Sequence, residues 1–504
     1  MADKGKVWLI GAGPSDAGLF TIKGKHILEQ ADVVVYDKLA GQGVLGMIPP
    51  QAEKIDVGKH SGSHPVPQND INHILLKLAL QGKKVVRLKG GDPFLFGRGG
   101  EELELLADNG IPFEIVPGVT SAISVPAYAG IPVTHRAYAS SLHIITGHTQ
   151  KGGKSDIDFH SLAKLNGTLV FLMGVTALPV ICEGLADAGM DANKPAAILE
   201  RGTTAAQRRV VSTLSKLCDA ARKEEIKPPS VIVIGEVCRL AEQLHWAEDR
   251  ALGGMRVVNV RPADRMSRLT DMLTWHGAEV VEFPCIKTSA IDPNPALYQA
   301  VKNIKQYDWV AFTSPFGVDV FFEFLSGHGV DIRELAGIKI AAIGEATADR
   351  IRCRGIFVDY VPEVYSAVQL GTGLSRLAKG KRVLIPRAQD GAEDLTTVLE
   401  ENAEYEDVPI YTTEFVDGHI DEVSDIVKNG EYDMVLFTSA STVRGFVGAL
   451  PLQDYSKVNA LCIGGQTASQ AKKHGMPVTV AKQATLDGML QALIQWKKDR
   501  EKTC

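Results

Sequence analysis

The chain has 504 residues, of which 45% are hydrophobic, 23% charged and 6% aromatic. This composition excludes a largely disordered, collagen-like or disulfide-scaffold protein, and the length indicates about two to four domains, of which we favour two. The formal charge of −6 provides no overall field that would attract nucleic acid or an anionic membrane. An anionic ligand would therefore need a local basic cleft.

Cysteine usage and the apolar segments narrow the class of protein further. The seven cysteines include no Cys-x-x-Cys pair, so the sequence predicts neither a disulfide framework nor a metal site. The apolar run at residues 7–10 is too short for a secretory signal. Residues 115–134 are uncharged, but three prolines among them favour a strand, a turn and a helix over a membrane span. We therefore expect a cytoplasmic protein without a membrane or nucleic-acid partner.

Short β-rich runs alternate with helical patterns along the first half, which is typical of α/β layering. The predicted strands are residues 7–10, 33–36, 84–88, 113–116, 143–146, 169–173 and 231–235. A polar helix is expected after the last of them. Gly253 and Gly254 then precede a new strand at 255–260. We place the domain boundary between residues 246 and 254, which gives domains of residues 1–245 and 255–504.

The second half contains an internal repeat. The segment VAFTS at 310–314 recurs as VLFTS at 435–439, and IAAIGEAT at 340–347 recurs as ALCIGGQT at 460–467. Each unit reads as a strand, a small polar turn and a helix, which predicts two related α/β lobes. The Thr-Ser pairs occupy positions where helix N-caps are expected, so capping and ligand contact both remain open for them.

A glycine-rich turn follows the first strand, with the sequence GAGPSDAG at 11–18. Asp37 closes the next strand at a spacing that resembles a dinucleotide-binding turn. The third glycine comes late, however, and Asp16 places a carboxylate where a pyrophosphate would need a helix N-terminus. A neutral or cationic ligand therefore fits better than a nicotinamide dinucleotide. A nucleotide-dependent oxidoreductase is the rival hypothesis, which binding of NAD would support.

A second segment, RLKGGDPFLFGRGGEE at 87–102, is more specific. Gly90 and Gly91 allow the backbone to approach a ligand closely, and Asp92 supplies a fixed carboxylate. Arg98 lies where a helix is predicted to begin. A purely structural loop seldom needs so many specialised residues, so we expect this segment to be functional.

Together with PGVTSA at 117–122, AGIPVTHR at 129–136 and TGH at 146–148, these motifs strongly resemble the tetrapyrrole methylase family. The resemblance is to its uroporphyrinogen-III C-methyltransferases and covers nearly all of residues 5–240. One departure concerns the first turn, where the family usually reads GAGPGD and this chain has Ser15. We expect this change to tighten the loop without abolishing cofactor binding.

The resemblance implies a fold, a cofactor and a substrate. It implies a two-lobed α/β domain that binds S-adenosylmethionine between its lobes and releases S-adenosylhomocysteine. The methyl acceptor would be a porphyrinogen with eight carboxylates, and the domain would form a homodimer. The cationic sulfonium of the cofactor suits Asp16 and Asp92. By the family pattern, the cofactor-contacting residues are Pro14, Gly90, Gly91, Asp92, Leu95, Thr120, Ser121, Met173 and Gly202.

The resemblance also implies roles for charged side chains. Asp37 resembles the family's proton acceptor, and Lys59 resembles its proton donor or the partner of a substrate carboxylate. Arg98 and Arg136 are candidates for holding substrate carboxylates, because a guanidinium pairs with a carboxylate in a bidentate manner.

The second half resembles the uroporphyrinogen-III synthase family, through its paired turns and through Pro386 and Arg387 after a predicted strand. The resemblance implies a bilobal α/β domain that closes hydroxymethylbilane to uroporphyrinogen III, which is the substrate of the methylase. No nucleophile-base pair is evident there, so we expect shape and hydrogen bonding to carry the catalysis. The candidate substrate-binding residues are Thr313, Ser314, Thr347, Arg387, Thr438 and Ser439.

Two questions stay open at this point. The second half could instead be a non-catalytic, two-lobed regulator, which failure to convert hydroxymethylbilane would indicate. If both halves are enzymes, the product precorrin-2 would leave for the sirohaem or the cobalamin pathway.

Overall fold

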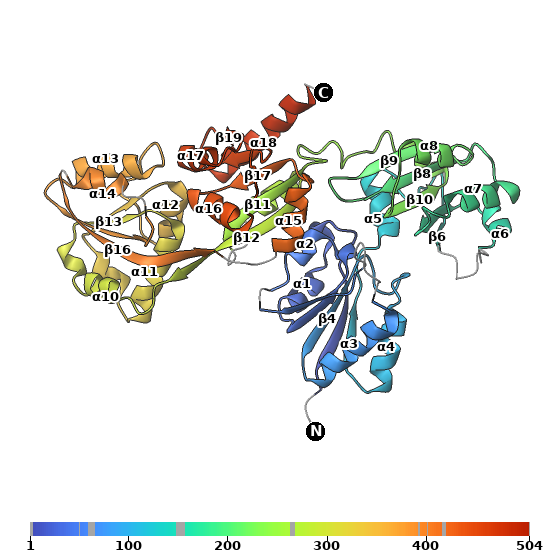
Figure 1. The fold of residues 1–504 in the computed structure, drawn as a ribbon, viewed down its shortest axis with the longest axis horizontal. Coiled ribbons are helices and arrows are strands. Elements are labelled where there is room, and N and C mark those ends of the chain that lie inside the picture. Colours follow the sequence, from blue (N-terminus) through green and yellow to red (C-terminus); the bar gives the residue numbers. More distant parts are fainter. Residues whose placement is uncertain are drawn as a thin grey trace. The chain divides into compact units, whose positions relative to one another are not determined.

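The structure is a computed structural model that describes residues 4–49, 51–58, 66–147, 157–262, 268–391, 394–400, 402–415 and 420–502 (Figure 1). It separates into two compact units. The first comprises Met1–Val257 and Thr270–Glu282, and the second comprises Val258–Leu269 and Phe283–Cys504. Among the described residues, no helix is both long enough and apolar enough to cross a membrane.

The first lobe of the first unit is built on a parallel sheet with the strand order β3-β2-β4-β1-β5. Its strands are rich in Val, Ile and Leu, as a sheet buried on both faces requires. Their bounds are β1 (Lys6–Gly11), β2 (Val33–Tyr36), β3 (Glu53–Asp56), β4 (Lys84–Lys89) and β5 (Phe113–Val116).

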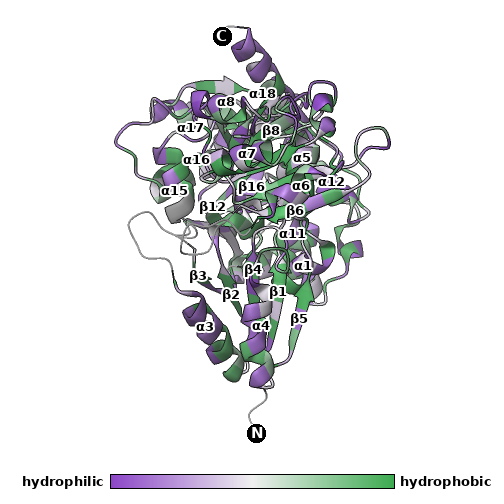
Figure 2. Cartoon of the chain, turned by 90° about the vertical axis from the view of Figure 1, so that its right-hand side faces the viewer, coloured by the Kyte–Doolittle hydropathy of each residue, from purple (hydrophilic) through white to green (hydrophobic). Residues whose placement is uncertain are grey.

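Helices cover both faces of this sheet. Successive strand side chains point to opposite faces, so Val7 and Leu9 pack with α3 and α4, whereas Ile10 packs with α1 and α2. Hydrophobic (green) and hydrophilic (purple) residues both occur along α3 and α4 in Figure 2, as expected for helices with one face on a sheet. The helices are α1 (Ile22–Leu28), α2 (Gln42–Leu45), α3 (Gln68–Leu80) and α4 (Gly99–Asp108), with the 3-10 turns η1 (Ala17–Leu19) and η2 (Lys38–Ala40).

The second lobe has a mixed sheet with the strand order β6-β7-β10-β8-β9. Only β6 and β7 are parallel neighbours. Helix α5 packs on one face, and α7 and α8 pack on the other. The elements are β6 (Leu142–Thr146), β7 (Thr168–Leu172), β8 (Pro195–Glu200), β9 (Arg208–Thr213), β10 (Ser230–Ile234), α5 (Ser121–Tyr128), α6 (Phe159–Ala163), α7 (Leu178–Asp187) and α8 (Leu217–Lys223).

The polar helix predicted after β10 is the one element of this unit that the structure corrects. The segment forms only a short 3-10 helix, η3 (Glu236–Leu240), followed by turns. A tertiary contact competes with helix continuation, because Arg209 Nη1 donates to the carbonyl oxygen of Ala241 at 2.8 Å. Trp246 Nε1 likewise donates to the carbonyl oxygen of Ala127 at 3.0 Å. Long-range contacts of this kind are invisible to a local pattern.

The second unit is built on a nine-stranded sheet with the order β14-β13-β15-β16-β12-β11-β17-β18-β19. The strands are β11 (Arg256–Pro262), β12 (Glu279–Ala290), β13 (Trp309–Phe312), β14 (Lys339–Ala342), β15 (Arg382–Ala388), β16 (Glu404–Phe415), β17 (Met434–Phe437), β18 (Ala460–Cys462) and β19 (Val478–Val480). Helix α9 (Arg268–Trp275) lies mostly in the Thr270–Glu282 segment of the first unit. The helices of the second unit are α10 (Pro295–Lys302), α11 (Pro315–Gly327), α12 (Glu345–Arg352), α13 (Ala367–Leu377), α14 (Asp394–Leu399), α15 (Ile420–Lys428), α16 (Ala440–Ala449), α17 (Gly465–Lys473) and α18 (Leu486–Glu501), with the 3-10 turns η4 (Ile304–Gln306) and η5 (Ile332–Leu335).

The sequence repeat corresponds to a structural repeat. The pairs β13-α11 and β14-α12 recur as β17-α16 and β18-α17, and β13 pairs with β14 in parallel as β17 does with β18. Ser314 and Ser439 are the N-caps of α11 and α16, each accepting a hydrogen bond from a backbone amide three residues later. The predicted fold class, a two-lobed α/β domain followed by a bilobal α/β domain, is confirmed.

Candidate functional site

Three loops meet at the carboxyl edge of the first sheet. The amide of Ala12, after β1, donates to the carbonyl oxygen of Lys89 at 2.7 Å. Gly13 and Gly91 exchange two backbone hydrogen bonds, of 3.2 and 2.7 Å. The carboxyl edge is where open parallel sheets bind their ligands. The glycine turn and the loop after β4 are separate motifs in the sequence, and in the fold they form one structure.

Glycine is required here because the backbones touch. A Cβ atom on Gly11 would lie 2.5 Å from the Cα atom of Gly118, and one on Gly90 would lie 2.6 Å from the Cβ atom of Leu39. Gly91 is required for a different reason, because its φ of 66° is one that glycine adopts most easily. The direction in which a Cβ atom would point from Gly91 is open. Among the described residues other than its chain neighbours, a Cβ atom there would meet only the backbone nitrogen of Ser121, at 4.0 Å. Gly91 thus leaves room for a ligand beside the start of α5.

The Asp92 carboxylate holds these loops in place. Its Oδ1 accepts hydrogen bonds from the amides of Phe94 and Leu95, at 2.8 and 3.1 Å, and its Oδ2 accepts one from the amide of Gly118 at 3.1 Å. The side chain therefore joins the loop after β4 to the loop after β5. Hydrogen bonds between a carboxylate and backbone amides are among the stronger ones in proteins.

Two side chains tie this edge to the second lobe. Asp16 accepts a hydrogen bond from the Tyr128 hydroxyl at 2.7 Å, and the Thr203 hydroxyl donates to the carbonyl oxygen of Pro14 at 2.7 Å. Burial and the bond to Asp16 both raise the pKa of Tyr128, so its hydroxyl stays a donor. Tyr128 and Thr203 could not be singled out from the sequence, because neither belongs to a motif and each meets a residue more than a hundred positions away.

The remaining cofactor candidates lie around α5 or at a strand end of the second lobe. Thr120 is the N-cap of α5 and accepts a hydrogen bond from the Ala122 amide at 3.2 Å, with Ser121 as the first helical residue. Gly202 is pressed against the same helix. Leu95 packs into the core cluster that includes α5 residues. Met173, with a φ of 55°, is exposed directly after β7.

Asp37 follows β2 at the same carboxyl edge and is held at both oxygens. Its Oδ1 accepts a hydrogen bond from the amide of Leu39 at 3.2 Å, and its Oδ2 accepts one from Arg87 Nη2 at 3.3 Å. The side chain remains 23% exposed and so can still reach a ligand. Lys59, its predicted partner in catalysis, lies outside the described residues.

The two candidate carboxylate-binding arginines are both exposed. Arg98 precedes α4 with a φ of 57° and donates two hydrogen bonds to Glu101, at 2.9 and 2.5 Å. This pairing raises the pKa of Arg98 and lowers the pKa of Glu101. Exposed pairs contribute little stability, so the guanidinium can exchange partners at small cost. Arg136 lies in an exposed turn between α5 and β6.

The candidates of the second unit lie at strand ends or on strands and helices of its two lobes. Thr313 and Ser314 follow β13, and the Ser314 hydroxyl lies 2.9 Å from the hydroxyl of Tyr411. Thr438 and Ser439 follow β17 in the equivalent way. Buried Thr347 lies on α12, and buried Arg387, on β15, pairs with Asp407 of β16. Among the described residues, no cluster of three or more His, Cys, Asp or Glu side chains is placed to hold a metal ion.

Comparison with known proteins decides the family. Residues 6–218 match the model of tetrapyrrole (corrin/porphyrin) methylases, and residues 267–491 match that of uroporphyrinogen-III synthase HemD. The porphyrin biosynthesis protein HemD of Ruminiclostridium josui is 46% identical over 495 residues, which cover 98% of each chain. The chain belongs to this family of fused tetrapyrrole methylases and uroporphyrinogen-III synthases.

Further similarities concern part of the chain. Siroheme synthase 2 of Cronobacter sakazakii is 50% identical over 244 residues, which cover 48% of this chain and 52% of that protein. The chain thus spans about half the length of the siroheme synthases that it matches. The solved uroporphyrin-III C-methyl transferase of Thermus thermophilus, complexed with S-adenosylhomocysteine, is 41% identical and covers 47% of this chain and 99% of that one, with a TM-score of 0.41.

Family membership confirms the two enzyme activities predicted from the sequence. The methylase domain belongs to a family whose methyl donor is S-adenosylmethionine, which confirms the predicted cofactor. The match of residues 267–491 to the synthase family argues against a non-catalytic regulator in the second half. The oxidoreductase hypothesis for the glycine turn is likewise unsupported.

Proposed function

We propose that the methylase domain transfers two methyl groups from S-adenosylmethionine to uroporphyrinogen III, forming precorrin-2. The synthase domain supplies that substrate by closing hydroxymethylbilane. The observation that carries the proposal is the Asp37 carboxylate, fixed at both oxygens yet partly exposed, at the carboxyl edge where the glycine loops meet.

The glycine loops fit a methyl donor. The open space beside Gly91 lies next to the backbone amide of Ser121. Asp92 holds the loop that leads from β5 to Ser121. When bound, the donor supplies a methyl group on a cationic sulfonium. The residues proposed to hold it are Pro14, Gly90, Gly91, Asp92, Leu95, Thr120, Ser121, Met173 and Gly202. Several of them would act through backbone groups, so positioning dominates the catalysis.

Asp37 is proposed to accept the proton that a pyrrole system loses after methylation at carbon. General-base catalysis requires a basic group within reach of that proton, and the partly exposed carboxylate of Asp37 at the sheet edge is our candidate for it. Lys59 is proposed as a proton donor or a partner of a substrate carboxylate. Arg98 and Arg136 are proposed to bind other substrate carboxylates, for which a guanidinium is well suited.

In the synthase domain we propose that hydroxyl groups and turns at the ends of the parallel strands bind the linear substrate. Ring closure with loss of water needs a proton donor near the leaving hydroxyl, and the paired hydroxyls of Ser314 and Tyr411 offer one. Thr313, Thr347, Arg387, Thr438 and Ser439 are the other proposed binding residues. The protein is proposed to be cytoplasmic, to dimerise through its methylase domain and to feed the sirohaem or cobalamin pathway.

The direct test incubates the intact protein with hydroxymethylbilane, with and without S-adenosylmethionine, and analyses the oxidised products by mass and isomer. Type III ring closure plus two added methyl groups supports both halves of the proposal. Spontaneous type I product from the linear substrate would refute the synthase half, and absence of methylation of supplied uroporphyrinogen III would refute the methylase half.

A further inference from the structure

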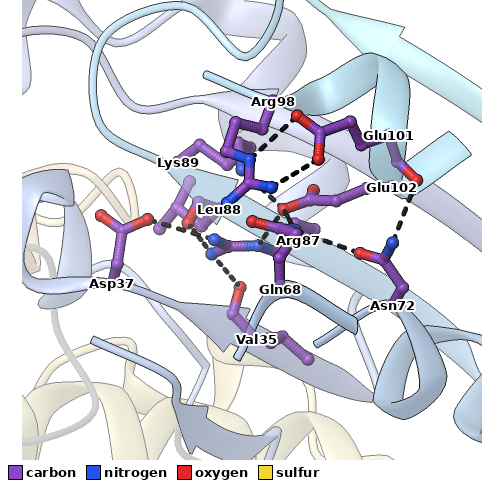
Figure 3. Close-up of polar contacts among 10 residues, drawn as sticks. All are labelled: Val35, Asp37, Gln68, Asn72, Arg87, Leu88, Lys89, Arg98, Glu101 and Glu102. Atoms are coloured by element: carbon purple, nitrogen blue, oxygen red, sulfur yellow. Dashed lines mark hydrogen bonds and ion pairs between the residues drawn. The ribbon is translucent and has the colours of Figure 1, made fainter. Parts of the chain in front are cut away.

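A buried cluster of charged side chains lies behind Asp37, between the first sheet and its helices α3 and α4 (Figure 3). Arg87 and Lys89 are two residues apart on β4, so their side chains point to the same face of the sheet. Glu102 comes from the first turn of α4. The exposed fractions of these three side chains are 4%, 7% and 0%.

One carboxylate oxygen of Glu102 accepts hydrogen bonds from three side chains of the cluster. Its Oε1 accepts hydrogen bonds from Lys89 Nζ at 2.7 Å, from Gln68 Nε2 at 3.0 Å and from Arg87 Nε at 3.4 Å. Its Oε2 is buried and accepts no hydrogen bond within the part of the chain that the structure describes. Burial and the charge of Arg87 lower the pKa of Lys89, against the opposing effect of Glu102. Taking these charges out of water is costly, and apolar side chains would fill the space at lower cost.

The guanidinium of Arg87 connects this cluster to Asp37. Arg87 Nη2 donates to Asp37 Oδ2 at 3.3 Å, and its Nη1 donates to the carbonyl oxygen of Leu88 at 3.0 Å. Arg87 therefore touches Glu102 on one side and Asp37 on the other. Arg87 forms an ion pair with Asp37, the charge of Lys89 also interacts with that carboxylate, and Glu102 pairs with both cations.

We propose that Arg87 and Glu102 are positioning residues for methyl transfer. Glu102 fixes the guanidinium of Arg87, and that guanidinium in turn fixes the orientation of the Asp37 carboxylate. The inference rests on the role of Asp37 in the proposed function. It explains why a charged cluster occupies a place in the core that an apolar cluster would fill at lower cost.

The test compares the pH dependence of kcat/KM for methylation of uroporphyrinogen III in two variants with opposite charge effects. Glu102→Gln removes an anion and leaves two cations near Asp37, which favours the charged form of its carboxylate. The acidic limb of the profile therefore moves to lower pH, and kcat falls roughly tenfold because a more strongly held carboxylate is a weaker base. Arg87→Met removes a cation, so the acidic limb moves to higher pH.

Controls separate positioning from mere stability. Glu114→Gln makes the same chemical change on β5, where Glu114 pairs with Lys6 at the opposite, amino edge of the sheet. It should leave the profile where it is. The carboxylates of the substrate titrate alike in every variant, so a difference between profiles belongs to the enzyme. Equal losses of melting temperature with unmoved profiles in Glu102→Gln and Arg87→Met would overturn the proposal.

Two further variants keep the test decisive. If Arg87→Met does not fold, Arg87→Lys keeps the charge but cannot bridge both carboxylates, and it should lower kcat with little change in the affinity for S-adenosylhomocysteine. A kcat equal to that of the wild type would count against positioning. Asp37→Asn distinguishes the two levels of proposal. Full activity of Asp37→Asn refutes the proposed role of Asp37 itself, whereas a strong loss there, with unmoved profiles in the other variants, refutes only the positioning by Arg87 and Glu102.

Discussion

Single residues at the carboxyl edge of the first sheet show both what a sequence reveals and what it conceals. Gly90, Gly91 and Asp92 could be singled out because they form a continuous motif with strong backbone consequences. The hydrogen bond from Thr203 to Pro14 could not be predicted, because the two residues are 189 positions apart and meet only when the two lobes have formed. Local motifs report loop conformation, whereas contacts between lobes depend on the tertiary fold.

Asp37 gives the first prediction at this scale. Asp37→Asn should lower kcat for methylation roughly a hundredfold or more, because the amide cannot accept the proton. Ring closure of hydroxymethylbilane by the same variant should be unchanged. Both rates are measured on one preparation, so a parallel loss of the two activities would contradict separate active sites.

Ser15 gives a second prediction. Its φ of 110° lies where glycine is favoured, and glycine is the usual residue at this position of the resembling family. Ser15→Gly should relieve local strain and stabilise the methylase domain by about 1 kcal/mol. The measurement is the melting temperature of the transition that S-adenosylhomocysteine raises. Ala177→Gly, at a φ of −95°, is the control and should not stabilise that transition.

At the scale of elements, helix α5 connects the two lobes of the methylase domain. Its N-terminus lies beside Gly91, its last residue Tyr128 bonds to Asp16, and its middle packs against Gly202. The prolines within residues 115–134 predicted a strand, a turn and a helix in this region. Its place between the lobes followed only from the structure, because it depends on partners distant in sequence.

The packing of Gly202 against α5 gives a third prediction. A Cβ atom at Gly202 would lie 2.3 Å from the Cγ1 atom of Val125, so Gly202→Ala must displace the loop or the helix. We expect the Kd for S-adenosylhomocysteine to rise about tenfold or more, measured by isothermal titration calorimetry. Gly46→Ala is the matched control, because its nearest contact would be an ordinary 3.4 Å to the carbonyl oxygen of Gln42. An unchanged Kd for Gly202→Ala would show that α5 does not shape the site.

The strand ends of the second unit were more predictable. Ser314 and Ser439 cap α11 and α16 as one of the two sequence interpretations expected, since an N-cap is decided by the few residues around it. The hydroxyl pair of Ser314 and Tyr411 was beyond prediction, because β16 comes beside β15, the neighbour of β13, only in the folded sheet.

At the scale of the whole molecule, the two compact units predict separable activities. In the wild type, Arg387 on β15 pairs with both oxygens of the Asp407 carboxylate. Arg387→Met removes this cation and leaves the carboxylate unpaired by it, which destabilises the second unit. We expect conversion of hydroxymethylbilane to fall while methylation of supplied uroporphyrinogen III is retained. A joint loss of both activities in this variant would mean that the units depend on each other for stability.

The strand order of the nine-stranded sheet has a consequence for biosynthesis. Strands β13, β14, β15 and β16 come from a continuous stretch of chain, whereas β11 is the neighbour of β17, which is more than 170 positions later in the sequence. Contacts between distant segments form late, because a long loop must first be closed. On the ribosome, the continuous part can complete its strands once residue 415 has emerged. The part that holds both ends of the unit must wait for β17, β18 and β19. Until β17 is made, β11 lacks one of its two neighbours, and its open edge needs protection from aggregation.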